Sequence, residues 1–125
     1  MDDHGHHEDL IGGISEQLEP LFKNSTQGIY VYLDEAHKAC NEKLSSLLGY
    51  ESPSEWASLE PFTDSLIAEE SQEALVSAYQ NAMEKFEGSS QEIVWKKKDG
   101  TKVTKTVILV PVVYEGHTMA LHFIS

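Results

Sequence analysis

Residues 40–50 read CNEKLSSLLGY, and this stretch predicts a strand that runs directly into a short, sharply terminated helix. Asn41 is a suitable N-cap, because its side-chain oxygen can accept from a first-turn amide that has no partner within the helix. Gly49 stands where a left-handed residue ends a helix, and Tyr50 can fold back on the helix as the hydrophobic partner of that cap. Three leucines have the spacing of a helix with one buried face: Leu44, Leu47 and Leu48.

The composition indicates one soluble, folded domain. The chain has 125 residues, of which 40% are hydrophobic, which is enough to bury a core. The net charge is −12 and every one of the nine basic residues is a lysine. Because such a surface repels polyanions and lacks the bidentate arginine fork, we expect no contact with nucleic acid or with a membrane. One cysteine, no signal peptide and no long apolar run lead us to expect a cytoplasmic protein.

The N-terminal region divides into two parts. We expect residues 1–9 to be a flexible tail rich in histidine and acid. Its histidines, His4, His6 and His7, could gather a metal only weakly without a fold to fix their geometry, so no metal site is predicted. Residues 10–24 carry apolar side chains at helical spacing and predict a flanking helix that Pro20 breaks or restarts.

A strand with two useful faces follows at residues 27–33. Its aliphatic side chains alternate with Tyr30 and Tyr32. We expect the aliphatic face to line the core, and the tyrosine face to lie under the N-terminal helix or in a subunit contact.

The middle of the chain predicts helices and the last third predicts strands. A short helix begins at Ser52, residues 62–68 are expected to be irregular, and a longer helix covers residues 69–87 before Gly88. Asp99-Gly100 joins two strands in a hairpin, and Glu115-Gly116 leads into the final strand. Pro111 within the middle strand indicates a bulge or a locally unpaired position. This order predicts an α+β fold with an antiparallel sheet.

These features together resemble the PAS domain family. Residues 28–31 look like the first strand of the family, Asn41 and residues 47–50 look like the motif after the second strand, and Asp99-Gly100 looks like the hairpin between the third and fourth strands. The resemblance covers residues 25–125. It implies a five-stranded antiparallel sheet with helices packed on one face, a cavity between them, and the N-terminal flanking helix outside.

The resemblance also implies candidate site residues. Ligand-binding candidates would line the cavity: Ile29, Val31, Leu66, Tyr79, Met83, Trp95 and His122. Candidates for a dimer interface are Ile14, Leu18, Tyr30 and Tyr32. Each cavity candidate could instead be an ordinary core residue, and the sequence favours that interpretation, most strongly for the aliphatic residues. Asn41, Leu48, Gly49, Tyr50, Asp99 and Gly100 are interpreted as the structural motif residues.

The sequence departs from the family pattern at two places where other members bind a cofactor. Flavin photosensors of the family carry a cysteine in an Asn-Cys-Arg-type motif, and residues 62–70 contain neither cysteine nor arginine. Family members that bind haem use a histidine of the long helix, and residues 69–86 contain none. Cys40 is interpreted as a small buried hydrophobe. The flavin photoadduct and this mode of haem ligation are therefore disfavoured, and the identity of any cofactor stays open.

The function expected from the resemblance is that of a sensory module. It would bind a small ligand or dimerise, and would regulate an effector, such as a histidine kinase, in the same or a partner chain. Two alternatives remain. One is a small enzyme of a curved-sheet, cone-like type, with Asp64 and Tyr79 as acid and base. The other is a degenerate PAS domain with a filled cavity that only dimerises.

Overall fold

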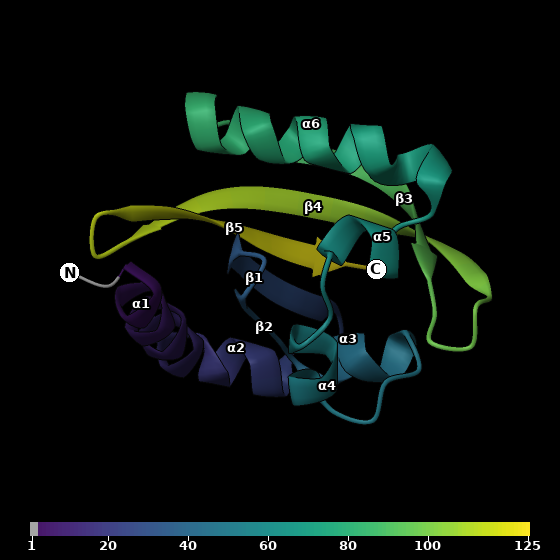
Figure 1. The fold of residues 1–125 in the computed structure, drawn as a ribbon, viewed down its shortest axis with the longest axis horizontal. Helices are drawn as coiled ribbons and strands as arrows, with labels where there is room; N and C mark the ends of the chain where they lie inside the picture. Colours follow the sequence, from purple (N-terminus) through teal and green to yellow (C-terminus); the bar gives the residue numbers. More distant parts are fainter. Residues whose placement is uncertain (1–2) are drawn as a thin grey trace.

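The computed structural model describes residues 3–125, with side chains from residue 6 onward, and shows a five-stranded antiparallel sheet between helices (Figure 1). The strands lie in the order β2-β1-β5-β4-β3, so the last strand pairs with the first. Their bounds are β1 Gly28–Asp34, β2 His37–Cys40, β3 Ser89–Lys96, β4 Lys102–Tyr114 and β5 His117–Ile124. This architecture confirms the α+β fold class predicted from the sequence.

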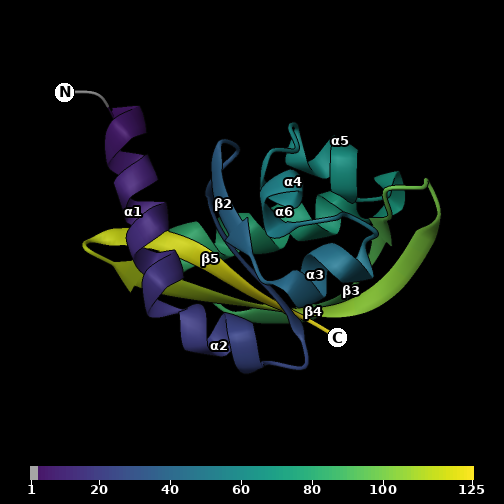
Figure 2. The same cartoon turned by 90° about the horizontal axis from the view of Figure 1, so that it is seen from below.

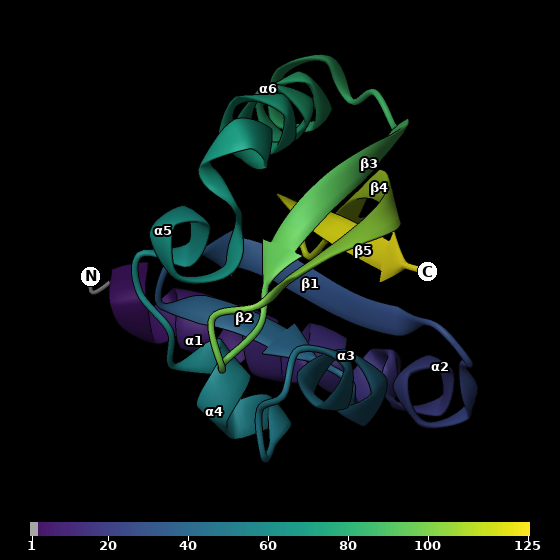
Figure 3. The same cartoon turned by 90° about the vertical axis from the view of Figure 1, so that its right-hand side faces the viewer.

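The helices divide between the two faces of the sheet. Two precede the sheet, α1 Asp3–Gln17 and α2 Glu19–Asn24. Four lie between β2 and β3: α3 Glu42–Leu47, α4 Pro53–Ala57, α5 Phe62–Leu66 and α6 Glu69–Lys85. Figures 1 and 2 show α1 and α2 against one face and α6 over the other. Figure 3 shows α4, α5 and α6 following one another from the bottom of the view to the top. None of the helices in residues 3–125 has the length and apolar character that crossing a membrane requires.

The predicted faces of β1 are the reverse of those observed. Ile29 and Val31 pack against Leu10 and Ile14 of α1. Tyr30 instead lies in the main core beneath α3 to α6. Both faces of β1 carry apolar groups, so alternation alone could not assign them to opposite sides of the sheet.

Asn41 has the capping role predicted for it and ties together more elements than expected. Its Oδ1 accepts from the Leu44 amide at 3.0 Å, which caps α3, and also from the Ile29 amide of β1 at 3.0 Å. Its Nδ2 donates to the carbonyl oxygens of Gln27 and Phe22. One buried side chain therefore connects α2, β1 and α3.

The end of α3 also follows the prediction. Gly49 has φ of +85°, a conformation that side chains with a Cβ rarely adopt. The Tyr50 amide donates to the Ser45 carbonyl at 2.8 Å, and Tyr50 packs on the core beside the α3 leucines. This arrangement is a glycine-terminated helix of the Schellman type.

The strand connections agree with the sequence. Gly100 has φ of +89° in the turn between β3 and β4, and Glu115 and Gly116 both have positive φ in the turn before β5. The β3–β4 ladder begins at the Ser89–Leu109 pair. Pro111 therefore lies beyond β3 with a partner only on β5, Ala120, and its missing N–H removes no ladder bond to β3.

Three local expectations were wrong. Helix α1 begins at Asp3 rather than at residue 10, so the described part of the expected tail is helical. Residues 62–66 form α5, whose N-cap, Pro61, offers no capping side chain and so no sequence signal. Helix α6 ends at Lys85, and its C-cap, Phe86, takes the left-handed conformation itself (φ 56°) two residues before Gly88.

Candidate ligand pocket

A pocket of about 80 Å³ lies between the sheet and helices α5 and α6. Four elements and one turn supply its walls. The lining residues are Tyr30 and Tyr32 from β1, Glu35 from the β1–β2 turn, Phe62 and Thr63 from α5, Leu75, Val76 and Tyr79 from α6, and His122 from β5. We call these nine residues the aromatic pocket.

The innermost wall of the aromatic pocket is a stacked pair of rings. Tyr30 and His122 are directly opposite each other in the β1–β5 ladder. Such cross-strand neighbours have Cβ atoms about 5 Å apart, so their rings can lie face to face. The two ring centroids are 3.9 Å apart and the planes are 8° from parallel.

Further rings enclose this pair. The Tyr30 ring lies 5.3 Å from the Trp56 ring, 5.6 Å from Phe62 and 5.9 Å from Trp95, measured between centroids. Tilted and edge-on contacts of this kind are favourable for aromatic quadrupoles and fix the ring positions. Tyr30 is therefore held rigidly at the centre of an aromatic cluster.

The pocket wall contains buried polar atoms that lack partners. Within the described part of the chain, Tyr30 Oη and His122 Nδ1 have no hydrogen-bond partner. The indole nitrogens of Trp56 and Trp95, in the core beside the pocket, also lack one. Leaving a buried polar atom unpaired costs about 1–3 kcal/mol, so such atoms in native proteins are usually satisfied by a bound molecule or by water.

Burial keeps both groups of the stack uncharged. Burial lowers the pKa of His122 to about 3, despite opposing hydrogen bonds with the Ala120 and Tyr30 backbone. Burial, with a smaller contribution from Tyr32, raises the pKa of Tyr30 well above its usual value. At neutral pH the stack therefore presents a neutral imidazole and a protonated phenol, which together can donate and accept hydrogen bonds.

Glu35 organises the rim of the pocket. Its Oε1 accepts from Tyr32 Oη at 3.3 Å, and its Oε2 accepts from the Phe62 amide at 2.8 Å. Burial raises the pKa of Tyr32, and the nearby Glu35 carboxylate raises it further. The Tyr32 hydroxyl is therefore a donor directed to Glu35, and this carboxylate joins the β1–β2 turn to the start of α5.

The predicted cavity residues are only partly brought together. Tyr79 and His122 line the pocket, and Met83 packs with Tyr79 on the same side of the sheet. Leu66 and Trp95 are buried in the core around it. The remaining two, Ile29 and Val31, face α1 on the opposite side of the sheet.

Several lining residues were not among the predicted cavity residues. The face of β1 that carries Tyr30 and Tyr32 was expected to meet the N-terminal helix or another subunit, and Phe62 and Thr63 lie on a helix that was not predicted. The strand periodicity did place Tyr30 and Tyr32 together on one face. A preference for aromatic residues in pockets could have selected that face.

The dimer candidates are largely internal to one chain. Ile14 and Tyr30 are buried, and Tyr32 is half-buried against the rings of Phe62 and Tyr79. Leu18 is half-buried beside the core between α1 and the sheet. The exposed apolar side chains of the sheet are on β4 instead, at Ile108, Val110 and Val113.

The residues of the enzyme alternative are not assembled. Asp64 is exposed on α5 and is not among the lining residues, whereas Tyr79 lines the pocket. Burial, followed by the charge of Asp34, raises the pKa of Tyr79. Cys40 is buried as expected, and burial raises the pKa of its thiol to about 12, which keeps it protonated.

Comparisons with known proteins were made by sequence and by structure. No family model matches the sequence, and no curated protein matches it. The structure is similar to the PAS domain of an HTR-like protein from Haloarcula marismortui, with a TM-score of 0.66 and 23% identity over 97% of this chain and 98% of that one.

Two further solved structures agree. A PAS domain from Colwellia psychrerythraea gives a TM-score of 0.70 at 22% identity, covering 90% of this chain and 95% of that one. A domain of a sensory box sensor histidine kinase/response regulator from Geobacter sulfurreducens gives a TM-score of 0.65 at 18% identity, covering 89% of this chain and 92% of that one. The five-stranded sheet, its strand order and these similarities show that the chain has the PAS fold.

Proposed function

We propose that this protein is a sensory module whose signal is the occupancy of the aromatic pocket by a small, uncharged, polar molecule. The observation that carries the proposal is the pair of unpartnered atoms, Tyr30 Oη and His122 Nδ1, on two of the residues that line the pocket. A ligand that hydrogen-bonds to both atoms would remove the cost of leaving them unpaired.

The size of the pocket limits the class of ligand. Sites for drug-sized ligands occupy about 300–1,000 Å³, whereas this pocket has about 80 Å³. That volume suits a molecule of a few non-hydrogen atoms and is far smaller than a flavin or a haem. Because the stack is neutral, a neutral ligand with one donor and one acceptor fits it better than an ion.

The pocket lies where occupancy can alter several elements at once. Its walls belong to β1, β5, α5 and α6, and the other face of β1 carries helix α1. A ligand that prefers one arrangement of these elements shifts the population toward it. We infer an effector, such as a histidine kinase, in the same or a partner chain, a homodimeric assembly and a cytoplasmic location. The similarity to a domain of a sensor histidine kinase/response regulator supports the inferred effector.

The proposal is tested with protein freshly purified from cells under native conditions. Native mass spectrometry should show a bound molecule of low mass that is lost on denaturation, and the absorption spectrum should show no flavin or haem band. A bound flavin or haem would overturn the assignment of ligand class. A chain that carries no molecule and binds none of a set of small polar compounds would favour the role in dimerisation alone.

A further inference from the structure

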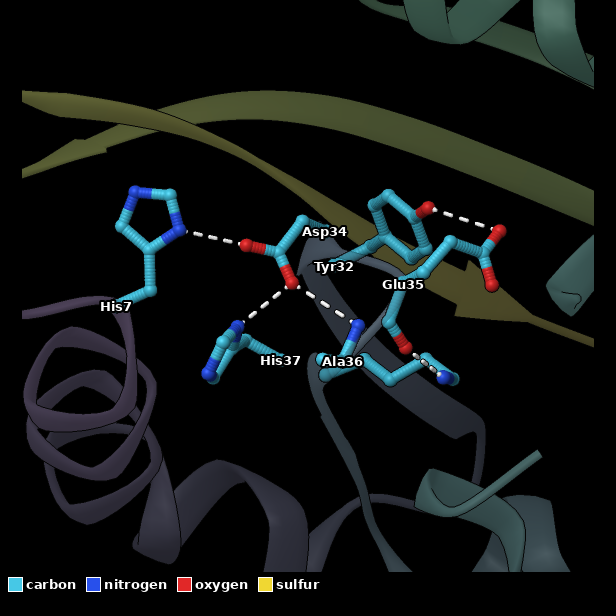
Figure 4. Close-up of polar contacts among 7 residues, drawn as sticks. His7, Tyr32, Asp34, Glu35, Ala36 and His37 are labelled. Atoms are coloured by element: carbon cyan, nitrogen blue, oxygen red, sulfur yellow. Dashed lines mark hydrogen bonds and ion pairs between the residues drawn. The ribbon is translucent and has the colours of Figure 1, made fainter. Parts of the chain in front are cut away.

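A cluster of two histidines and one aspartate joins three segments that are distant in sequence. His7 belongs to α1, Asp34 ends β1 and His37 begins β2. His7 Nδ1 is 2.6 Å from Asp34 Oδ2, and His37 Nδ1 is 2.7 Å from Asp34 Oδ1 (Figure 4). We call these three residues the His-Asp-His cluster.

The cluster is fixed by the fold. His37 is only 5% exposed, and Asp34 Oδ1 also accepts from the Ala36 amide at 3.0 Å, which holds the carboxylate within the β1–β2 turn. His7 is positioned by α1, whose Leu10 and Ile14 are buried against the sheet. His7 was expected to lie in a flexible tail without fixed geometry, and α1 supplies that geometry.

We propose that His7, Asp34 and His37 bind one divalent transition-metal ion of the borderline class, for which Zn²⁺ is the appropriate probe. Two imidazole nitrogens and a carboxylate oxygen are a donor set that suits such ions and occurs in zinc sites. The hard ions Mg²⁺ and Ca²⁺ prefer oxygen ligands, so the cluster selects against them.

The distances permit this coordination with small movements. One ligand atom from each of the three side chains lies within 4.8 Å of the other two. Donor atoms around a tetrahedral zinc lie about 3.4 Å apart, because zinc bonds to nitrogen and oxygen are about 2.0–2.2 Å long. Rotation of the three side chains would exchange the two hydrogen bonds with Asp34 for bonds to a shared ion.

The surroundings favour a cation and give it access. The side chains of His7 and Asp34 are 30% and 36% exposed, so the cluster is open to solvent on one side. The chain has a net charge of −12, which attracts cations. The rings of His117 and His6 have centroids 6.2 Å and 6.5 Å from that of His7, which leaves the fourth position to one of these rings or to water.

Occupancy would connect α1 directly to the β1–β2 turn. The ion would link α1 to the β1–β2 turn, in addition to the packing of α1 on the sheet. Because a ligand that binds the native state stabilises that state, the ion would stabilise the folded protein. None of the three cluster residues lines the aromatic pocket.

Zinc titration of the metal-free full chain tests the proposal. Isothermal titration calorimetry, with nickel and magnesium as comparison ions, is run on the wild type and on the variants His7→Ala, Asp34→Asn and His37→Ala. Glu16→Gln is the matched control. It removes one negative charge from an exposed position of α1, the helix that carries His7, and Glu16 belongs neither to the cluster nor to the aromatic pocket. Circular dichroism in chelator verifies that every variant is folded.

We expect one zinc ion per chain and a dissociation constant raised on the order of 100-fold in each of the three variants, since even the loss of an outer partner of a metal ligand costs 10–100-fold. Glu16→Gln should bind as the wild type does. Zinc X-ray absorption should show at least two imidazole ligands. If His37→Ala and Asp34→Asn bind zinc as tightly as the wild type, the ion is held by the N-terminal histidines alone and the proposal is wrong. The absence of zinc binding by the wild type would equally overturn it.

Discussion

The ring of His122 on β5 lies parallel to the ring of Tyr30 on β1, with 3.9 Å between the centroids. Both residues are essentially inaccessible to solvent, and their cross-strand register places them on the side of the sheet that carries α5 and α6. This pair forms the inner wall of the aromatic pocket and bears its two unpartnered polar atoms, so the chemistry of the proposed site depends on it.

The buried histidine predicts that the protein loses stability in mild acid. The pKa of His122 is about 3 in the folded protein because of burial, against an ordinary value of 6.5. Between pH 6.5 and pH 3 the unfolded chain therefore binds a proton at this position that the folded protein does not. The free energy of unfolding should fall by up to about 1.4 kcal/mol per pH unit from this residue as the pH falls through that range.

Urea unfolding at several pH values, followed by tryptophan fluorescence, measures this effect. Carboxylates contribute their own pH dependence, so the comparison is with His122→Phe, which retains an aromatic ring for the stack and cannot be protonated. The wild type should lose stability more steeply below pH 6.5 than the variant. Equal slopes would show that His122 titrates normally in the folded protein.

Replacing the Asn41 side chain should lower the stability of the protein substantially. Asn41→Ala would remove the cap of α3 and leave the buried Ile29 and Leu44 amides without their acceptor. We expect a loss of about 3 kcal/mol, the sum of a cap and the desolvation of a buried amide. Ser52→Ala is the control, because Ser52 caps only α4 by accepting from the Glu55 amide, and should cost about 1 kcal/mol. Chemical denaturation of both variants tests the difference, and equal losses would contradict the role of Asn41 as a connecting residue.

Replacing Gly49 or Gly12 with alanine should change the stability of the protein in opposite directions. Gly49→Ala forces a Cβ into a left-handed conformation and should cost about 1–2 kcal/mol. Gly12→Ala, within α1 and with open space around the added atom, should instead stabilise the protein by about 0.5–1 kcal/mol. Thermal unfolding of the two variants compares them directly. A stabilising Gly49→Ala would mean that the backbone at this position is not left-handed.

Local sequence signals were sufficient for most of the fold. The cap at Asn41, the glycine at 49 and the turn at Asp99-Gly100 each act through neighbouring backbone groups, so a short stretch of sequence contains the whole cause. The β1 alternation correctly separated Tyr30 from Ile29, but the side of the sheet that each face meets depends on the packing of α1 and α6, which no local pattern specifies.

The candidate sites required information from distant parts of the chain. The pocket combines β1, α5, α6 and β5, and α5 is a five-residue helix without a capping side chain. The His-Asp-His cluster joins His7 to a turn at residues 34–37, and its formation depends on how α1 docks. The spacing of residues along the sequence therefore could not predict either the pocket or the cluster.

The most direct test of the proposed function is a titration of the isotopically labelled protein with small, neutral, polar compounds, followed by amide NMR. Val76→Trp places a large side chain at the pocket wall, and Val113→Trp, at an exposed position of β4 outside the pocket, is the matched control. We expect at least one compound to shift the amide signals of Tyr30, Tyr79 and His122 in the wild type and in Val113→Trp, and to leave Val76→Trp unchanged. The same shifts in Val76→Trp, or no shifts in the wild type with any compound, would contradict a ligand site in the aromatic pocket.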